Sequence, residues 1–150
     1  MKIKSSAFNH LQPIPKKYSC DGESVNPPLI ITEIPKSAIS LVLVMEDLDA
    51  VKNKIHWIIW NIPPKWARKV RIKEKLIPYP AVEGINDFDM IGYCGPCPAP
   101  QKVHRYRFKV YALDKKLKLS PKAKFEDLKK AIKNSIIEKA ELIGIYQRSK

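Results

Sequence analysis

Two short polar clusters contain the side chains that could do chemistry in this chain. The first holds Asp47, which follows the mostly apolar run 40–46 and stands nine residues before His56. The second holds His104 and Tyr106, which begin a stretch of alternating apolar and basic residues. Two imidazoles and a phenol can donate hydrogen bonds to phosphate or carboxylate oxygens, and a carboxylate behind one histidine fixes its tautomer and favours its charged form. If the two clusters meet, they form a small anion-binding pocket.

A stiff loop leads into the second cluster. Residues 92–100 contain two glycines and three prolines. Because proline fixes its own φ and restricts the residue before it, such a loop can hold its shape without ladder hydrogen bonds. We expect Pro96, together with Trp57 and Tyr93, to form apolar walls of the pocket.

Other interpretations of the same residues stay open. A histidine at a strand end is often structural, and Asp47 and Asp49 can cap turns. His56, His104 and an aspartate could bind zinc, although no HxH or HExxH spacing preorganises such a site. No GxSxG elbow supports nucleophilic hydrolysis. The prediction is a non-enzymatic binding protein without metal or cofactor, and the alternative is a hydrolase or lyase that uses the same His/Asp set with or without metal.

Short strands must position these clusters. The apolar runs 40–46 and 55–62 predict strands that are buried on both faces, and only eight residues separate them, so they are expected to be antiparallel neighbours. The alternation of apolar and basic residues from Tyr106 to Asp114 predicts a half-buried strand. Further strands are expected near residues 3–8, 26–31 and 70–72. Proline and glycine between the strands favour an antiparallel β-sandwich.

The C-terminal part shows a different period. Its apolar residues recur at spacings of three and four, which is typical of helices; they are Phe125, Leu128, Ile132, Ile136, Ala140 and Ile143. We expect two short peripheral helices that are interrupted at 134–135, followed by a small strand at 143–146.

Length and composition indicate one domain, 1–150, in a cytoplasmic protein. The chain is 45% hydrophobic and 29% charged, and no apolar run is long enough for a membrane span. The formal net charge is +13, but the lysines are scattered and are not interleaved with aromatics, so no specific nucleic-acid partner is expected. A basic surface favours anionic lipid or acidic protein partners equally. The Lys- and Ile-rich composition is typical of thermophiles.

The three cysteines are Cys20, Cys94 and Cys97. Their odd number implies no disulfide framework. Residues 94–97 spell the thioredoxin tetrapeptide, but prolines and a strand follow it, so no helix dipole can favour the thiolate. We therefore expect the cysteines to be small buried residues of a structural loop rather than a redox site.

Taken in order, these stretches resemble the phosphatidylethanolamine-binding protein family, also called the kinase-inhibitor-protein family, and especially its prokaryotic members. The matching pieces cover residues 20–22, 26–29, 46–50, 56–57, 60–63, 84–88, 92–98, 104–106, 111–114 and 144–148. The resemblance implies a Greek-key antiparallel β-sandwich with short peripheral helices near the C-terminus. It also implies a small pocket for phosphate-like anions, including phospholipid headgroups, and no general catalytic activity. The family's pocket residues fall on Asp47, His56, Gly95, Pro96, His104 and Tyr106.

The resemblance also implies a protein partner, because family members regulate protein kinases or inhibit serine proteases, and a homodimer, because prokaryotic members pair. This chain departs from the family where Leu48 and Val51 replace both prolines of an Asp-Pro-Asp-Ala-Pro motif, and where Ala99 replaces the second proline of a Pro-Pro pair. A non-proline cis peptide costs about 3 kcal/mol, so a cis bond before Val51 is not expected. The loop can therefore differ in shape and in the ligand it accepts.

Overall fold

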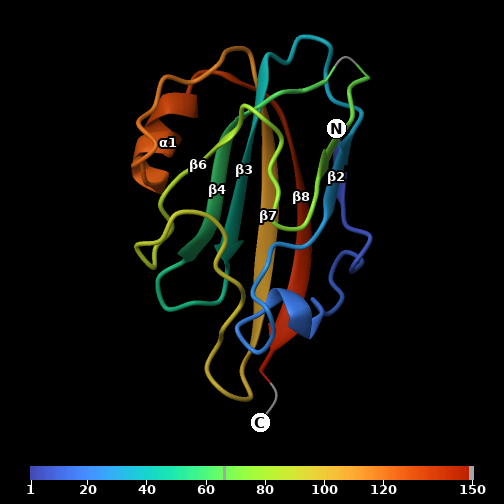
Figure 1. Cartoon of the computed structure of the whole chain (residues 1–150), viewed down its shortest axis with the longest axis vertical. Coiled ribbons are helices and arrows are strands. Elements are labelled where there is room, and N and C mark those ends of the chain that lie inside the picture. Colours follow the sequence, from blue (N-terminus) through green and yellow to red (C-terminus); the bar gives the residue numbers. More distant parts are fainter. Residues whose placement is uncertain (66, 149–150) are drawn as a thin grey trace.

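Two antiparallel sheets face one another in the computed structural model, which describes residues 1–65 and 67–148 (Figure 1). The smaller sheet has the order β1-β2-β5, and the larger has the order β6-β4-β3-β7-β8. The strands are β1 (Lys2–Lys4), β2 (Leu29–Thr32), β3 (Ser40–Asp47), β4 (Lys54–Ile62), β5 (Val70–Ile72), β6 (Val82–Glu83), β7 (Val103–Leu113) and β8 (Ile136–Gln147). A 3-10 turn, η1 (Lys16–Tyr18), and one helix, α1 (Phe125–Ile132), complete the described elements.

The larger sheet contains a Greek key. Strands β3, β4 and β6 lie side by side in chain order, and β7 then returns to pair with β3 on its other edge. This arrangement gives the order of a Greek key, in which a fourth strand lies beside the first of three. The predicted antiparallel pairing of β3 with β4 is confirmed, and so is the predicted fold class.

The main core lies between the two sheets, where Ile31 of β2 faces Leu43 of β3 and Phe108 of β7 within one apolar cluster. A second cluster lies on the outer face of the larger sheet, where Leu128 and Ile132 of α1 cover the strands (Figure 1). Both faces of β3 are therefore covered, which explains why its sequence is continuously apolar instead of alternating. In β7, by contrast, Phe108 is buried and its neighbour Arg107 is half-buried, as the alternating sequence predicts.

The prediction of a second helix after residue 134 is wrong. Residues 136–147 form β8, which pairs with β7 from Val103 to Leu113. The apolar spacing fits a helix, but a strand also places Leu142, Gly144 and Tyr146 on one buried face. Pairing with β7 decides between the two, because strand propensity depends on tertiary context. The first strand is also shorter than expected, since it ends at Lys4 and Ser5 then hydrogen-bonds the carbonyl of Pro28.

Within residues 1–65 and 67–148, no helix is long and apolar enough to cross a membrane, and α1 has only 8 residues.

Candidate functional site

Three adjacent strands bring the two polar clusters to one end of the larger sheet. Asp47, the last residue of β3, lies opposite Tyr106 of β7 on one side and opposite Lys54 of β4 on the other. His56 stands two residues into β4 from Lys54, on the same face of the strand. The expected meeting of Asp47, His56, His104 and Tyr106 is therefore what the strand register produces.

The Asp47 carboxylate positions His104. Its Oδ2 accepts a hydrogen bond from Nδ1 of His104 at 2.8 Å, and its Oδ1 accepts from the backbone N–H groups of Asp49 and Ala50 at 2.9 and 3.1 Å. The carboxylate is 4% exposed, so these three donors satisfy a buried charge that would otherwise be costly. Because Nδ1 of His104 is occupied, Nε2 is the nitrogen that remains for a ligand.

The turn behind Asp47 is fixed by an ion pair. The guanidinium of Arg105 forms a fork on both oxygens of Asp49 at 3.0 and 2.9 Å, and the Arg105 backbone N–H also donates to Asp49 at 2.8 Å. This side-chain hydrogen bonding holds the pKa of the Asp49 carboxyl below its usual range. Asp49 thus ties the turn after β3 to the start of β7, next to His104.

His56 is held by the loop that follows β6. Its Nδ1 lies 2.7 Å from the carbonyl oxygen of Cys94, and the Cys94 backbone N–H donates to the carbonyl of His56 at 3.0 Å. A carbonyl can only accept, so Nδ1 carries a proton in this contact. The ring is 3% exposed and packs edge-on against Phe88 and Tyr106. This burial lowers the pKa of His56, although the Cys94 carbonyl and the charge of Asp47 oppose the shift.

Tyr106 places an unpartnered hydroxyl on the floor of the site. The residue is fully buried, and among the described residues its phenol oxygen has no hydrogen-bond partner. Burial, and next the charge of Asp47, raise the pKa of Tyr106 far above its usual value, so the phenol keeps its proton. Since a buried polar group without a partner is destabilising, the free O–H is a donor that a bound anion could satisfy.

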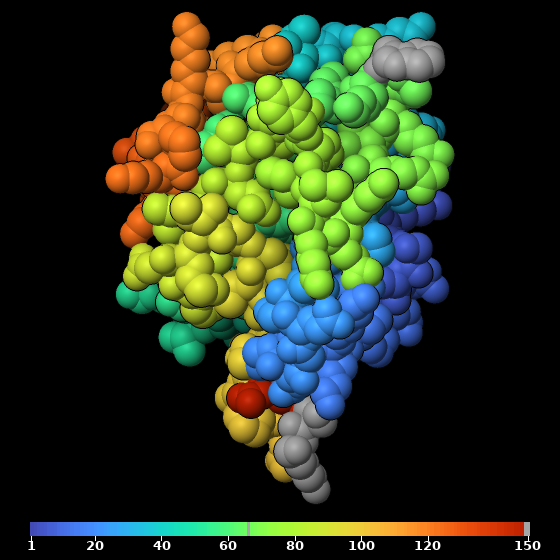
Figure 2. All heavy atoms as spheres, in the orientation of Figure 1, coloured from blue at the N-terminus to red at the C-terminus, as the bar shows by residue number. Residues whose placement is uncertain are grey.

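The glycine of the stiff loop is required by close packing. The Gly95 backbone N–H donates to Oγ of Ser24 at 3.0 Å, and a Cβ at this position would lie 2.5 Å from the carbonyl oxygen of Tyr18. The neighbouring Pro96 is buried behind the site, where its carbonyl accepts from the Cys20 backbone N–H at 3.0 Å. The loop therefore lies directly on the turn at 18–24, and Figure 2 shows these two segments side by side.

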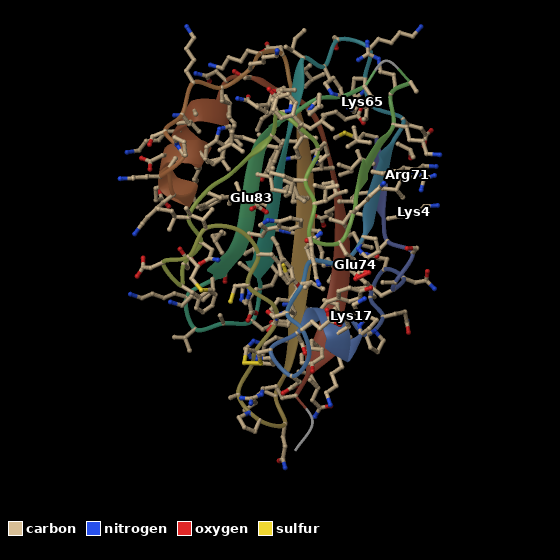
Figure 3. All side chains as sticks on the ribbon, in the orientation of Figure 1. Lys4, Lys17, Lys65, Arg71, Glu74 and Glu83 are labelled. Atoms are coloured by element: carbon tan, nitrogen blue, oxygen red, sulfur yellow. A yellow bond between two sulfur atoms is a disulfide. The ribbon has the colours of Figure 1, made fainter. Side chains whose placement is uncertain are left out.

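The expectation that the cysteines are small buried residues is wrong for Cys20 and Cys97, which are exposed. Cys20 and Cys97 are bonded, with their Cα atoms 5.4 Å apart and a sequence separation of 77, and Cys94 remains free. The bond joins the loop to the turn after η1. The preceding η1 is held to the 73–76 segment by an ion pair of Lys17 with Glu74 at 2.8 Å (Figure 3). Sequence alone could not reveal the bond, because connectivity cannot be read from cysteine spacing.

The four polar residues line a cavity of about 810 Å³, a size typical of small-molecule sites. The full lining is Cys20, Asp47, Ala50, Val51, Lys52, Lys54, His56, Phe88, Cys94, Gly95, Cys97, Pro98, Ala99, His104 and Tyr106. Of the predicted site residues, Pro96 alone is not part of it. The predicted walls Trp57 and Tyr93 are absent from it as well.

The misplacement of the walls has a simple cause. Trp57 follows His56 at an irregularity in the register of β3 with β4 and lies in the core cluster between the sheets, where its Nε1 donates to Glu83 at 2.9 Å. Tyr93 packs edge-on against Trp57 and donates to the Tyr18 carbonyl at 2.6 Å, so it braces the loop from behind. Val51 and Phe88 form apolar walls instead, and both are exposed loop residues without a periodic signal. Lys54 could have been predicted as a lining residue, because it lies two residues before His56 in the same strand.

The chemistry of this arrangement is that of hydrogen bonding to an anion. His56, His104 and Tyr106 line the same cavity, and Lys52 and Lys54, which also line it, add positive charge. Within residues 1–65 and 67–148, no group of three His, Cys, Asp or Glu side chains is arranged to hold a metal ion.

Comparison with known proteins gives a consistent result. The sequence model described as phosphatidylethanolamine-binding protein matches residues 4–147. A UPF0098 protein of Methanothermobacter thermautotrophicus is 43% identical over 154 residues and covers 99% of both chains. Another from Pyrococcus abyssi is 46% identical over 151 residues, covering 96% of this chain and 84% of that protein. A crystal structure of a proposed phosphatidylethanolamine-binding protein homologue from Chlamydia trachomatis is 41% identical, with a TM-score of 0.90 and coverage of 99% and 97%.

Proposed function

The chain belongs to the phosphatidylethanolamine-binding protein family, and from this premise we propose that its cavity binds a small phosphate-like anion without converting it chemically. The observation that carries the proposal is the unpartnered, fully buried hydroxyl of Tyr106, which lies between two imidazoles whose Nδ1 atoms are both occupied. Three side chains thus leave one polar atom each for a ligand. Carbonyl and carboxylate groups of the protein hold the two imidazoles in place before any ligand arrives.

Binding is favoured over catalysis because the cavity offers no activated nucleophile among its described residues. Burial raises the pKa of the Cys94 thiol, which disfavours the reactive thiolate. Neither imidazole is hydrogen-bonded to a serine or cysteine side chain, since Cys94 and Asp47 occupy their Nδ1 atoms through a carbonyl and a carboxylate. Asp47 is satisfied by three donors, so it supports His104 instead of acting as a base.

The proposal is tested by an NMR titration of the His56 and His104 ring signals with inorganic phosphate and with O-phosphoethanolamine. Both rings are expected to shift with one common dissociation constant, because they line one cavity. His10 is the internal control, since this exposed ring lies outside the cavity and accepts a hydrogen bond from the Ile143 backbone N–H. Its signals should stay unchanged.

A double variant, His56→Ala with His104→Ala, should lose anion affinity, while His10→Ala should keep it. Unchanged affinity in the double variant would contradict the proposal. Turnover of a phosphoester by the wild-type protein, abolished in the double variant, would instead favour the enzyme alternative.

A regulatory role follows by analogy with the family. We propose that a protein partner, such as a kinase or a serine protease, binds the protein at the anion-occupied cavity and its exposed residues Val51 and Phe88. Inhibition assays against both enzyme classes, with and without phosphate, test this part separately from the titration.

A further inference from the structure

We infer that the cavity selects an oxyanion that still carries a proton, such as hydrogen phosphate, over sulfate and over phosphodiesters. The inference rests on the proposed function and deepens it, because it specifies the chemical form of the anion. It follows from the hydrogen-bonding direction of each polar atom that the cavity offers: one atom accepts and the others donate.

The accepting atom is Nε2 of His56. The Cys94 carbonyl, 2.7 Å from Nδ1, cannot donate, so the proton of the neutral ring lies on Nδ1 and Nε2 keeps its lone pair. The ring is buried between Phe88 and Tyr106, which disfavours a second proton. A lone pair repels a bare anion oxygen but accepts a hydrogen bond from a P–OH group. This one atom therefore distinguishes a protonated oxyanion from one without a proton.

The donating atoms serve the remaining oxygens of the ligand. The hydroxyl of Tyr106 is unpartnered and keeps its proton. His104, whose Nδ1 donates to Asp47, keeps Nε2 for the ligand and donates from it when the ring is charged. Sulfate or a phosphodiester can use these donors, but it leaves the lone pair of His56 without a partner.

The other charged groups near His56 do not change its hydrogen-bonding role. Asp87 accepts from the Ile55 backbone N–H at 2.7 Å and does not line the cavity, and Asp47 already accepts from three donors. The rim lysines, Lys52 and Lys54, supply positive charge but only donate. Among the described lining side chains, His56 is thus the acceptor best placed for a P–OH group.

The experiment compares inorganic phosphate with sulfate at mildly acidic pH, at which a histidine side chain can carry a second proton, by calorimetry and by NMR. Both are tetrahedral oxyanions of similar size, and phosphate alone keeps a proton. We expect phosphate to bind about ten- to hundredfold more tightly, which is the effect of one hydrogen bond to a charged group. Glycerophosphoethanolamine, a phosphodiester without a P–OH group, should bind as weakly as sulfate.

Two variants separate the roles. His56→Phe keeps an aromatic ring but removes the acceptor, so the preference for phosphate over sulfate should fall to about onefold. Tyr106→Phe removes a donor, so it should weaken both anions and leave their ratio unchanged. The matched control His10→Phe should change neither. Nitrogen NMR of the wild-type protein gives a readout independent of variant folding: His56 should carry its proton on Nδ1, both with and without phosphate.

Each result has one meaning. Equal affinity for sulfate and phosphate, with both pocket rings shifting, would overturn the selection for a protonated anion and leave the anion pocket standing. A diester that binds as tightly as phosphate, or a His56 proton on Nε2, would overturn it too. If no anion moves either ring at millimolar concentration, the proposed function itself fails.

Discussion

Removal of the Cys20–Cys97 bond should destabilise the protein strongly. The bond closes a loop of 77 residues, for which the chain-entropy relation gives about 4.5 kcal/mol of stabilisation at 25 °C. Both cysteines are exposed, so little packing is lost when Cys20→Ala and Cys97→Ala are combined. For 150 residues, the same loss lowers the melting temperature by roughly 14 °C.

The assay is urea denaturation of the wild-type protein, the double variant and the wild type under reducing agent. The last two should share one midpoint, because reduction and substitution remove the same cross-link. Cys94→Ala is the matched control, since this free cysteine is half-buried and lies in the same loop; its cost should stay below about 1 kcal/mol. A loss under about 1 kcal/mol for the double variant would refute the entropic reasoning. Peptide mapping without reducing agent checks the bond itself.

Further changes should have the following effects. Gly95→Ala should cost about 1–3 kcal/mol in urea denaturation and weaken phosphate binding, because the new Cβ would lie 2.5 Å from the Tyr18 carbonyl; a wild-type midpoint would contradict this close packing. Asp47→Ala should weaken phosphate binding in calorimetry and cost about 1–3 kcal/mol, because two backbone N–H groups and His104 lose their acceptor. The folded-state pKa of His56 is lowered from 6.5, so the unfolded chain binds more protons there; its contribution to stability is complete above pH 6.5 and is lost as the pH falls through the folded-state pKa. Wild type should therefore lose more stability than His56→Phe between neutral and mildly acidic pH, and parallel pH profiles would exclude this role. Leu142→Ala should cost about 2–5 kcal/mol, and Ile137→Ala under about 1 kcal/mol, because residue 142 is buried in β8 and residue 137 is exposed; equal losses would contradict the strand.

Sequence reasoning located the site because polar side chains end or begin strands that are otherwise apolar or alternating. Asp47 is a buried charged residue at the end of a strand that is otherwise mostly apolar, and His56 is a polar residue within a buried strand. The eight-residue connection between them fixed the antiparallel pairing of β3 and β4, and the alternation in β7 gave the third strand. The ligand-binding role of these residues stays a prediction.

The parts that failed depend on contacts between distant segments. Residues 136–147 have an apolar spacing that fits either a helix or a strand, and the pairing with β7 decides. The Cys20–Cys97 bond crosses half of the chain, so no local pattern could indicate it. The walls at Val51 and Phe88 come from irregular loops, where side-chain direction follows no period. Trp57 was misplaced because it is part of the core cluster between the sheets, beside an irregularity in the register of β4.

The central place of β3 links the cavity to the cooperativity of the whole molecule. β3 is hydrogen-bonded on both edges, to β4 and to β7, and its last residue holds His104. Its backbone amides should therefore exchange with deuterium mainly through global unfolding. An anion that binds at the end of β3 raises the free energy of global unfolding, by about 2.7 kcal/mol when its concentration is 100 times the dissociation constant. Hydrogen exchange throughout the core should slow accordingly. Hydrogen exchange at strands far from the cavity can thus report occupancy by any ligand, including one whose identity is not known in advance.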